Sequence, residues 1–494
     1  MTFVPHSNGS GALFELVARG QKDKFLQNDN ADAQSAFDNR YKSSAPFMTE
    51  RRTTVPLNAP RFGNTFEIEL DRYGDILLDC ALLIDLPYWF PPLPTTVGGM
   101  PLDPIYANSQ YFIRAVSSPS NTLLYGYTNY IGYLMFESIQ FYQDQILIQE
   151  WSGESLLCTQ FTEGSWSSSF LEQKNAGFNT NINLRATPGQ LRVHLPLPGL
   201  QTPGDGGFPF CCVPSQNYRL KIKIRPLEDI VVCNDPNIVK PAPWNEPAFT
   251  YPLGTFPNYI QFPPLTREQI GQPNILLETQ QAYISNETMS ALQESQITIP
   301  FRKVFENVFT IGELDYKPLD YGGTATITRR LDARHMAERV MFIFRTGSNL
   351  EKNRLYNFFN DFTTPTQEPT LADNTTFYTG LKLVIAGQDR ESLWEQFIWQ
   401  DLEALVKDER DNGLGIGEMR WNYGSTIDRD VPAPRQPEGS INFTTADRPT
   451  LHIQLTNVPV TKCLGQRSAE LRVFIESWNV YEMQQGRGRL LFAS

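Results

Sequence analysis

The feature that most restricts how this chain can fold is a two-residue alternation of apolar and polar side chains in several short segments. In residues 65–70, Phe66, Ile68 and Leu70 lie on one side of an extended chain and the glutamates lie on the other. Similar segments occupy 218–225, 450–455 and 471–480, a longer apolar one covers 76–86, and 136–151 reads as a hairpin that turns at Gln143 and Asp144. This pattern is typical of strands with one buried face, so we predict a mostly β protein.

Helices are few in the expected fold. We predict a short helix at 12–18 and a second helix that begins at Ser392, where Glu395 completes a capping-box pattern. The second helix continues with apolar residues at helical spacing, which are Trp394, Phe397, Ile398, Leu402 and Leu405. Because parallel strands need helical crossovers, two antiparallel sheets packed face to face, as in a jelly roll or another Greek-key sandwich, fit this chain best.

Two long irregular stretches, 87–128 and 233–275, separate some of the strands. The second stretch contains nine of the 36 prolines. Because proline has no backbone N–H to donate, we predict a loop or spacer there rather than a strand ladder. Long loops on compact domains are usually functional, so both stretches are candidate contact surfaces.

Composition excludes several classes of protein. The chain is 40% hydrophobic and 19% charged, which is not the composition of a disordered protein. Its formal net charge of -12 argues against a nucleic-acid binder, since duplex binding requires a basic face. No apolar run approaches the ~20 residues that a membrane span needs, and the first 20 residues lack a signal-peptide pattern. We therefore expect a soluble protein made in the cytosol.

The chain contains an internal repeat with a period of roughly 200 residues. The hairpin at 136–151 has a counterpart strand and turn at 381–390. Each half also ends in two alternating strands, and the last of these carries an aromatic residue followed by a Glu and a Met. We therefore predict a duplicated β domain with its boundary near Gln293.

Neither cysteine nor histidine occurs in a pattern that predicts a metal site, a cofactor site or a disulfide framework. The adjacent Cys211 and Cys212 could form a redox or metal site, but we interpret them as two small apolar residues of a strand. Only four histidines occur, and we interpret His194 and His335 as structural. We expect no bound metal and no cofactor.

The main alternative from another class is a glycan-binding or glycan-cleaving β-sandwich protein. Glu150 and Glu154 flank Trp151 and could serve as the carboxylate pair of a glycoside hydrolase. We interpret both as exposed turn carboxylates, since proximity is common among 54 acidic residues. The glycines of 413–417 follow no strand, and the chain has neither a GxSxG elbow nor a GxxxxGK[ST] loop. We therefore predict that the protein is not an enzyme.

Four asparagines stand in N-x-[ST] sequons and are candidate N-glycosylation sites: Asn8, Asn286, Asn374 and Asn442. Assembly in the cytosol would keep them away from the secretory pathway. We interpret them as incidental.

Several stretches in order along the chain resemble the major capsid proteins of large icosahedral double-stranded DNA viruses, the double jelly-roll family. Residues 11–26 are similar to the family's opening "G-x-L-x-x-L-V-A-x-G-x-x-D-x-x-L", and 136–154 to its "V-E-V-x-I-G-G-Q-x-I-D-K-x-x-G-E-W" hairpin. Residues 383–390 resemble "L-x-L-N-G-x-D-R", and 435–443 resemble "Q-P-S-G-T-x-N-F-S". The ending at 478–491 is similar to "Y-N-V-L-R-I-M-S-G-M-G-G-L". Their order over nearly the whole chain makes the resemblance specific.

The resemblance implies an all-β fold of two consecutive eight-stranded antiparallel jelly rolls, with long loops and few short helices. It implies an N-terminal arm at 1–27, a first jelly-roll domain at 28–293 and a second at 294–494. The implied function is that of a structural major capsid protein, whose trimers form pseudo-hexagonal capsomers that tile the shell. A diverged minor capsid protein of the same family is the alternative within this class.

The resemblance also implies partners and a location. The partners would be two further copies in a homotrimer, neighbouring capsomers, and minor capsid and penton proteins. The protein would not contact nucleic acid directly. It would be connected to an inner membrane beneath the shell only indirectly. The arm would face the interior and contact minor capsid proteins through Ala12, Leu13, Phe14, Leu16 and Val17. The protein would be located in the virion capsid and assembled in viral factories of the host cytoplasm.

Overall fold

The computed structural model describes most of the chain from residue 46 onward. The described residues are 46–87, 96–97, 100–101, 114–115, 123–163, 190–201, 206–233, 237–245, 249–252, 259–262, 265–360, 376–408, 415–421, 439–446 and 448–492. The chain divides into two units, Met1–Pro46 and Phe47–Ser494, and everything below concerns the second unit. The predicted helix at 12–18 lies outside the described residues.

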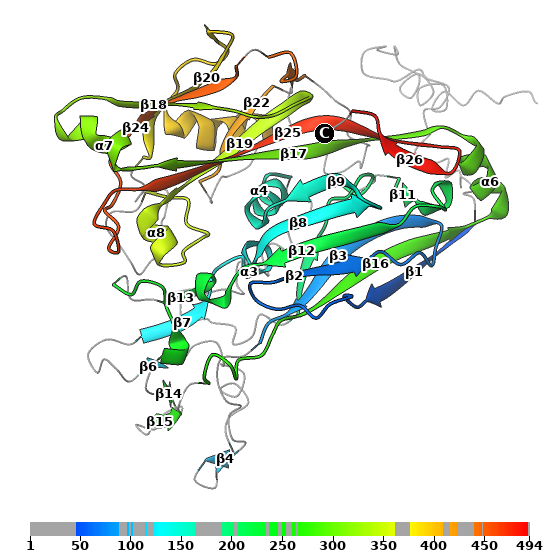
Figure 1. The fold of residues 1–494 in the computed structure, drawn as a ribbon, viewed down its shortest axis with the longest axis horizontal. Helices are drawn as coiled ribbons and strands as arrows, with labels where there is room; N and C mark the ends of the chain where they lie inside the picture. The colour runs from blue at the N-terminus through cyan, green and yellow to red at the C-terminus, as the bar shows by residue number, and fades with distance from the viewer. Residues whose placement is uncertain are drawn as a thin grey trace, which may run out of the picture. The chain divides into compact units, whose positions relative to one another are not determined.

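The first half of this unit forms two antiparallel sheets (Figure 1). One sheet has the order β1 (Phe47–Thr54), β16 (Asn274–Ile284), β3 (Ile76–Asp85) and β10 (Leu191–His194), and β11 (Phe208–Pro209) also pairs with β3. The other has the order β2 (Thr65–Glu69), β12 (Tyr218–Ile224), β8 (Phe136–Gln143) and β9 (Ile146–Trp151). The predicted hairpin turn is confirmed, because β8 ends at Gln143 and Asp144 adopts a positive φ of 50°.

The second half forms two sheets of the same kind. One has the order β17 (Ile297–Ile311), β25 (Ala469–Gln484), β19 (Met336–Thr346) and β22 (Gly417–Arg420). The short strands β23 (Ile441–Asn442) and β26 (Arg487–Leu490) pair with β19 and β25. The other sheet has the order β18 (Ala325–Arg330), β24 (Thr450–Leu455), β20 (Tyr378–Ile385) and β21 (Gln388–Asp389).

The two halves share one strand topology. If the eight principal strands of each half are numbered along the chain, both halves have one sheet of order 1-8-3-6 and one of order 2-7-4-5. Every pairing between these strands is antiparallel. This is the jelly-roll arrangement, so the predicted double jelly roll is confirmed. Among the described residues no sheet combines strands from both halves.

Short strands interrupt the two stretches that were predicted to be irregular. A further sheet has the order β13 (Val231–Cys233), β7 (Leu123–Tyr127), β6 (Arg114–Ala115), β14 (Phe249–Pro252) and β15 (Tyr259–Phe262), and β4 (Thr96–Val97) pairs with β5 (Met100–Pro101). The prediction that 233–275 contains no strand ladder was therefore wrong. The four-residue strands β14 and β15 fit between prolines, with Pro252 at the end of β14.

The structure has more helices than predicted. The α-helices are α3 (Ile131–Leu134), α4 (Gly153–Glu163), α6 (Asn286–Glu294), α7 (Glu313–Asp320), α8 (Gly347–Glu351) and α9 (Glu403–Asp408). Single turns of 3-10 helix are η1 (Phe210–Cys212), η2 (Leu227–Asp229) and η3 (Pro243–Asn245), and η5 (Ile398–Leu402) is a π-helical turn. The expected start at Ser392 was wrong, because Trp394 instead forms a β-bridge with Leu381.

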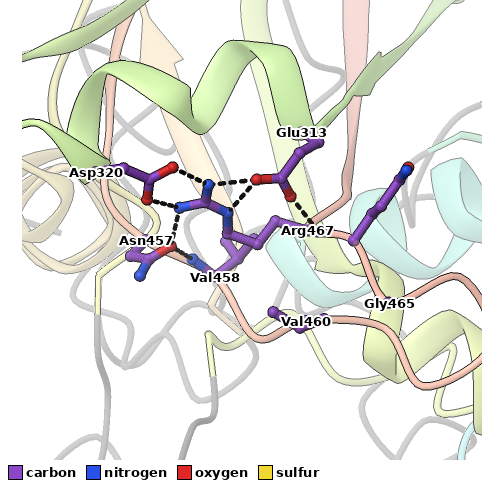
Figure 2. A pocket seen from close by; sticks show the side chains of 8 residues that line it. Glu313, Asp320, Asn457, Val458, Val460, Gly465 and Arg467 are labelled. Atoms are coloured by element: carbon purple, nitrogen blue, oxygen red, sulfur yellow. Dashed lines mark hydrogen bonds and ion pairs between the residues drawn. The ribbon is translucent and has the colours of Figure 1, made fainter.

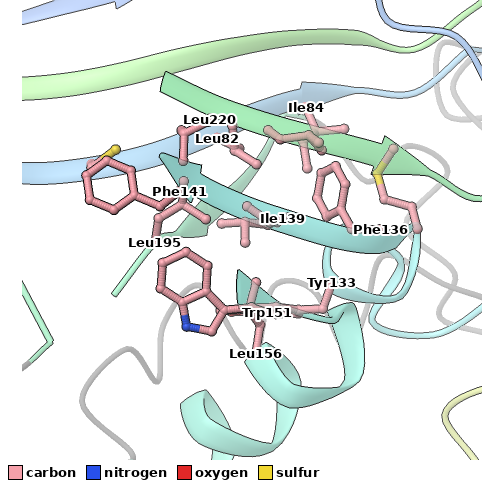
Figure 3. Packing of buried hydrophobic residues seen from close by; sticks show 14 of the residues in the cluster. Leu82, Ile84, Tyr133, Phe136, Ile139, Phe141, Trp151, Leu156, Leu195 and Leu220 are labelled. Carbon is pink, nitrogen blue, oxygen red and sulfur yellow. The ribbon is translucent and has the colours of Figure 1, made fainter. Parts of the chain in front are cut away.

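Two apolar cores meet at one shared sheet. In the first half, Phe136, Ile139, Phe141 and Leu220 of β8 and β12 pack with Trp151 (Figure 3). That core continues into the second half, since it includes the alternate residues Met341 and Ile343 of β19, Phe474 of β25, and Tyr481 and Met483 near the end of β25. The intervening residues of the same strands pack into the second core, for example Val340, Phe342, Val473 and Ile475. The sheet β17-β25-β19-β22 is therefore buried on both faces.

Candidate functional site: the buried contact between the two halves

Helix α4 connects the first half to the shared sheet. It begins directly after the hairpin β8–β9, where the Ser155 N–H donates to Ser152 Oγ at 3.1 Å. Its residues Leu156, Leu157 and Cys158 are fully buried. Figure 1 shows α4 beside β9 and next to the second half. Its polar side chains are buried as well, and buried polar groups need hydrogen-bond partners inside the protein.

Two threonines of α4 contact strands of the second half. The Thr159 hydroxyl donates to Glu476 Oε1 of β25 at 3.0 Å. The Thr162 hydroxyl lies 3.7 Å from the Met341 sulfur of β19. These contacts, 317 and 179 residues apart in the chain, fix the position of α4 against the shared sheet.

Glu154, at the start of α4, is surrounded by arginines. Its carboxylate lies 2.7 Å from Arg225 Nη2, 2.9 Å from Arg345 Nη1 and 3.5 Å from Arg472 Nη1. Burial alone would raise the pKa of Glu154, but the three guanidinium groups more than offset it and hold the pKa well below its usual range. The expectation that Glu154 is an exposed turn carboxylate was wrong, since its side chain has no exposed surface.

A second buried carboxylate lies on β25. Glu476 Oε2 is 2.6 Å from Arg339 Nε and 3.2 Å from Arg302 Nη1, and all three side chains are almost fully buried. Burial by itself would raise the pKa of Glu476. Arg339 and Arg302 have the larger effect and lower the pKa to about 2. Glu476 is therefore ionised throughout the physiological range.

Arg472 extends the cluster of charges around Glu154. Its guanidinium lies 3.0 Å from Glu306 and 2.7 Å from Glu470, and Glu470 also pairs with Arg345. Burial raises the pKa of Glu306 despite the nearby Arg472. We call the four carboxylates and five arginines the interhalf network: Glu154, Glu306, Glu470 and Glu476, with Arg225, Arg302, Arg339, Arg345 and Arg472.

A chain of hydrogen bonds joins the halves on another side. The Tyr218 and Tyr481 hydroxyls are 2.8 Å apart, and the Tyr481 hydroxyl donates to Gln143 Oε1 at 2.6 Å. The Gln143 side-chain amide in turn donates to the Gly488 carbonyl at 2.8 Å. These groups are buried in the contact, where their hydrogen bonds across the two halves take the place of hydrogen bonds to water.

The carboxylate pair of a glycoside hydrolase is not formed. Glu150 is exposed on β9, where its carboxylate accepts a hydrogen bond from Gln140 Nε2 at 2.8 Å. Glu154 is buried and ion-paired, so it cannot release or take up a proton near neutral pH. The two carboxylates therefore do not face a common substrate site.

A pocket of about 580 Å³ lies in the second half, between α7 and residues 457–467 (Figure 2). Arg467 is central to it and donates to Asp320 Oδ2 at 2.7 Å and to Asn457 Oδ1 at 3.2 Å, and it also pairs with Glu313. Because the charged groups satisfy one another, Arg467 joins α7 to the loop before β25 and does not provide a free charge for a ligand.

The predicted modification and arm residues are only partly described. Asn8, Asn374 and the arm residues Ala12, Leu13, Phe14, Leu16 and Val17 lie outside the described residues. Asn286 is exposed at the first residue of α6. Asn442 is exposed in β23, and its Oδ1 accepts from the Thr444 N–H at 3.0 Å. Asn286 and Asn442 lie in different elements, α6 and β23.

The cysteine and histidine residues have structural surroundings. Cys211 and Cys212 lie in the turn η1, not in a strand as expected, and their sulfurs are 3.8 Å apart as free thiols. His194 is buried, with Nδ1 3.0 Å from Asp79 and Nε2 3.0 Å from the Leu200 carbonyl. The ring of His335 lies 5.9 Å from that of Phe305.

The described residues lack two further features. Within them, no group of three or more His, Cys, Asp or Glu side chains is arranged to hold a metal ion. No helix in the same part of the chain has the length and hydrophobicity needed to cross a bilayer.

Comparisons with known proteins agree with this architecture. No family model and no curated protein matches the chain. Among solved structures, PBCV-1 VP54, fitted into a reconstruction of the virophage Sputnik, aligns over 93% of this chain and 100% of its own, with 13% identity and a TM-score of 0.64. The PBCV-1 virus capsid aligns equally far, with 13% identity and a TM-score of 0.62. Faustovirus major capsid protein aligns over 95% of this chain and 96% of its own, with 11% identity and a TM-score of 0.57. The chain therefore has the double jelly-roll fold of the viral major capsid proteins.

Proposed function

We propose that this protein is a structural subunit of the icosahedral shell of a large double-stranded DNA virus. The observation that carries the proposal is the sharing of one sheet, β17-β25-β19-β22, between two jelly rolls. Sharing a sheet makes the two sandwiches one rigid body with two similar outer faces. Such a body suits a role that depends on surface area and defined angles between neighbours.

We propose further that three copies form a trimer with a pseudo-hexagonal outline. Three chains with two similar jelly rolls each supply six similar sides, and closed cyclic symmetry is the usual way in which identical subunits assemble. Trimers would then contact neighbouring trimers, minor capsid proteins and penton proteins. The location would be the virion capsid, with assembly in the host cytoplasm.

The proposed domain boundaries follow the predicted ones: an arm at 1–27 and jelly rolls at 28–293 and 294–494. Residue 293 lies within α6, and the strands on either side of α6 belong to different sheets, which supports the second boundary. The proposed contact residues of the arm are Ala12, Leu13, Phe14, Leu16 and Val17. Deletion of 12–18 should leave trimers intact and impair shell closure, whereas a truncated chain that fails to fold would contradict the arm assignment.

No enzymatic role is proposed. Glu154 is committed to three arginines, and Arg467 in the pocket is committed to its own carboxylates. A structural subunit with these features needs no activated nucleophile and no general base.

Mass photometry of the purified chain tests the proposal. We expect particles of three times 56.2 kDa. A stable monomer at micromolar concentration would contradict the trimer. The number of copies of this chain in an isolated virus particle distinguishes a principal shell protein from a minor one, because a minor protein would be present in far fewer copies.

A further inference from the structure

The segment 393–405 has its apolar side turned outward. Leu393, Trp394, Phe397, Leu402 and Leu405 are 42%, 45%, 60%, 36% and 59% exposed. Gln396 and Gln400, by contrast, are 3% and 5% exposed. A helix on the surface of a monomer normally buries its apolar side and exposes its glutamines. We call the five outward side chains the 393–405 face.

The inward glutamines are well bonded, so this orientation is a stable feature of the fold. Gln396 Oε1 accepts from the Phe377 N–H at 2.7 Å, and Gln400 Nε2 donates to the Gly415 carbonyl at 2.8 Å. Trp399, which lies between the two glutamines in the sequence, is also buried, and its indole N–H donates to the Leu381 carbonyl at 3.0 Å. A contiguous apolar surface that the fold itself leaves exposed indicates a contact with another molecule.

The internal repeat identifies what covers this face. In the first half, α4 lies between the fifth and sixth principal strands, β9 and β10. In the second half, η5 and α9 lie between the equivalent strands, β21 and β22. Helix α4 packs against the 1-8-3-6 sheet of the other half, to which it is bonded through Glu476. The equivalent target of η5 and α9 is the 1-8-3-6 sheet of a first half, namely β1-β16-β3-β10.

That target sheet has an outer face of the same chemical kind as the one that α4 covers. Arg192 Nε lies 3.1 Å from Glu278, Arg51 lies 3.7 Å from Glu278, and Arg192 also pairs with Asp79. These side chains remain partly exposed, Arg51 to 56% and Arg192 to 27%. The corresponding sheet in the second half has its ion pairs buried in the interhalf network.

The segment that carries the 393–405 face is acidic. Residues 391–405 contain four carboxylates and neither lysine nor arginine: Glu391, Glu395, Asp401 and Glu403. The outer face of β1-β16-β3-β10 presents Arg51 and Arg192 together with their partners Glu278 and Asp79, so ion pairs with 391–405 would have to share these arginines. The contact inside the chain has the same polarity, since the carboxylate of Glu154 on α4 meets Arg345 and Arg472 of the sheet.

We propose that the 393–405 face of one copy docks on the outer face of β1-β16-β3-β10 of a second copy. The contact joins two different surfaces head to tail, and such a contact closes into a ring when the rotation between copies closes, as a three-fold rotation does. In a trimer, three contacts within chains would alternate with three equivalent contacts between chains. The proposal rests on the trimer of the proposed function and names the surfaces that form it.

The double variant Phe397→Asp with Leu405→Asp tests the docking surface. Both side chains are largely exposed, so the variant should retain the circular dichroism spectrum of the folded chain. Its mass should fall from three chains to one, because buried charges weaken an apolar contact by about tenfold or more. The matched control is Leu314→Asp on α7, a leucine that is 76% exposed and outside both surfaces; it should remain a trimer.

A mixing experiment tests the head-to-tail geometry. Thr49→Glu with Arg51→Glu makes the receiving face acidic, since alternate residues of β1 lie on one side, and this variant should also be monomeric. A mixture of the two double variants retains one intact pair of surfaces, so it should form particles of two chains.

The outcomes separate this inference from the proposed function. A wild-type trimer together with a trimeric Phe397→Asp and Leu405→Asp variant would overturn the docking surface and leave the capsid role standing. Monomeric variants that form no two-chain particles when mixed would overturn the pairing of these two surfaces. A monomeric wild-type chain would contradict the trimer itself.

Discussion

Glu154 illustrates how a single residue can determine how two large β-sandwiches fit together. Removing a carboxylate from water is costly, and the cost is repaid only where several well-placed cations surround it. Here Arg225 comes from the first half and Arg345 and Arg472 from the second. The carboxylate is therefore satisfied only when both halves are in place.

Replacing Glu154 with Gln should destabilise the protein by about 3–5 kcal/mol, the usual result of breaking a buried ion pair by removing one partner. Three guanidinium groups would lose their common carboxylate. Urea denaturation followed by tryptophan fluorescence measures the effect. The control is Glu150→Gln on the exposed part of β9, which should change the free energy of unfolding by less than about 0.5 kcal/mol.

The buried carboxylates also predict a sensitivity to acid. The pKa of Glu476 and that of Asp79 are each lowered to about 2, and that of Glu154 is lowered further. A carboxyl group whose pKa is lower in the folded chain than in the unfolded chain stabilises the fold at pH values above the unfolded pKa. That unfolded pKa is 4.5 for Glu, and the stabilisation is lost as the pH falls below it. The raised pKa of Glu306 acts in the opposite direction, since the folded chain then binds the proton more tightly.

The free energy of unfolding should therefore fall steadily between pH 4.5 and pH 2. Urea midpoints at a series of pH values measure this decline. The Glu154→Gln variant should lose less stability over the same range, because it has one carboxylate fewer to protonate. A wild-type midpoint that does not change on acidification would contradict the role of these carboxylates.

These residue contacts could not be predicted from the sequence. Glu154 stands close to Glu150 in the chain, and this suggested a pair, whereas its partners are 71, 191 and 318 residues away. Nothing local distinguishes a carboxylate that ends up buried among distant arginines from one in an exposed turn.

At the level of elements, the alternating strands were predictable, whereas among the described helices only the one after Ser392, present as η5 and α9, was predicted, and its start was wrong. Alternation in 65–70, 218–225 and 450–455 corresponds closely to β2, β12 and β24, because each of these strands buries one face. Helix α4 was missed because its polar side, with Ser155, Thr159 and Thr162, is buried against the second half and does not face water. Helix α7 contains Pro318, which usually ends a helix.

The start of α4 leaves no room for a side chain. A Cβ on Gly153 would contact the Tyr133 carbonyl oxygen and would lie 2.7 Å from that of Phe136, and both are backbone atoms. Gly153→Ala should therefore shift α4 and Glu154 with it, at a cost of about 1–3 kcal/mol or more. Urea midpoints provide the measurement. Gly206→Ala, with open space around its Cβ, is the control and should be nearly neutral.

At the level of the whole molecule, the shared sheet predicts cooperative unfolding. Neither jelly roll can lose β17-β25-β19-β22 without exposing the core of the other. Scanning calorimetry should therefore show one transition for the two halves, even though a chain of this length usually contains domains that melt separately. Two well-resolved transitions would show that the contact between the halves is weaker than its burial indicates.

The duplicated architecture was largely visible in the sequence, because the order of strand segments repeats. The sequence did not indicate that the segment 393–405 turns its apolar side outward, because Trp394, Phe397 and Leu405 have the spacing of a helix that buries its apolar side. Only the structure distinguishes an apolar face turned inward from one turned outward.

Electron microscopy of the purified, unmodified protein tests the central claim most directly. If the chain is a shell subunit that trimerises, class averages should show three-fold particles with a six-sided outline. Single-chain particles with no three-fold axis at micromolar concentration would contradict the account.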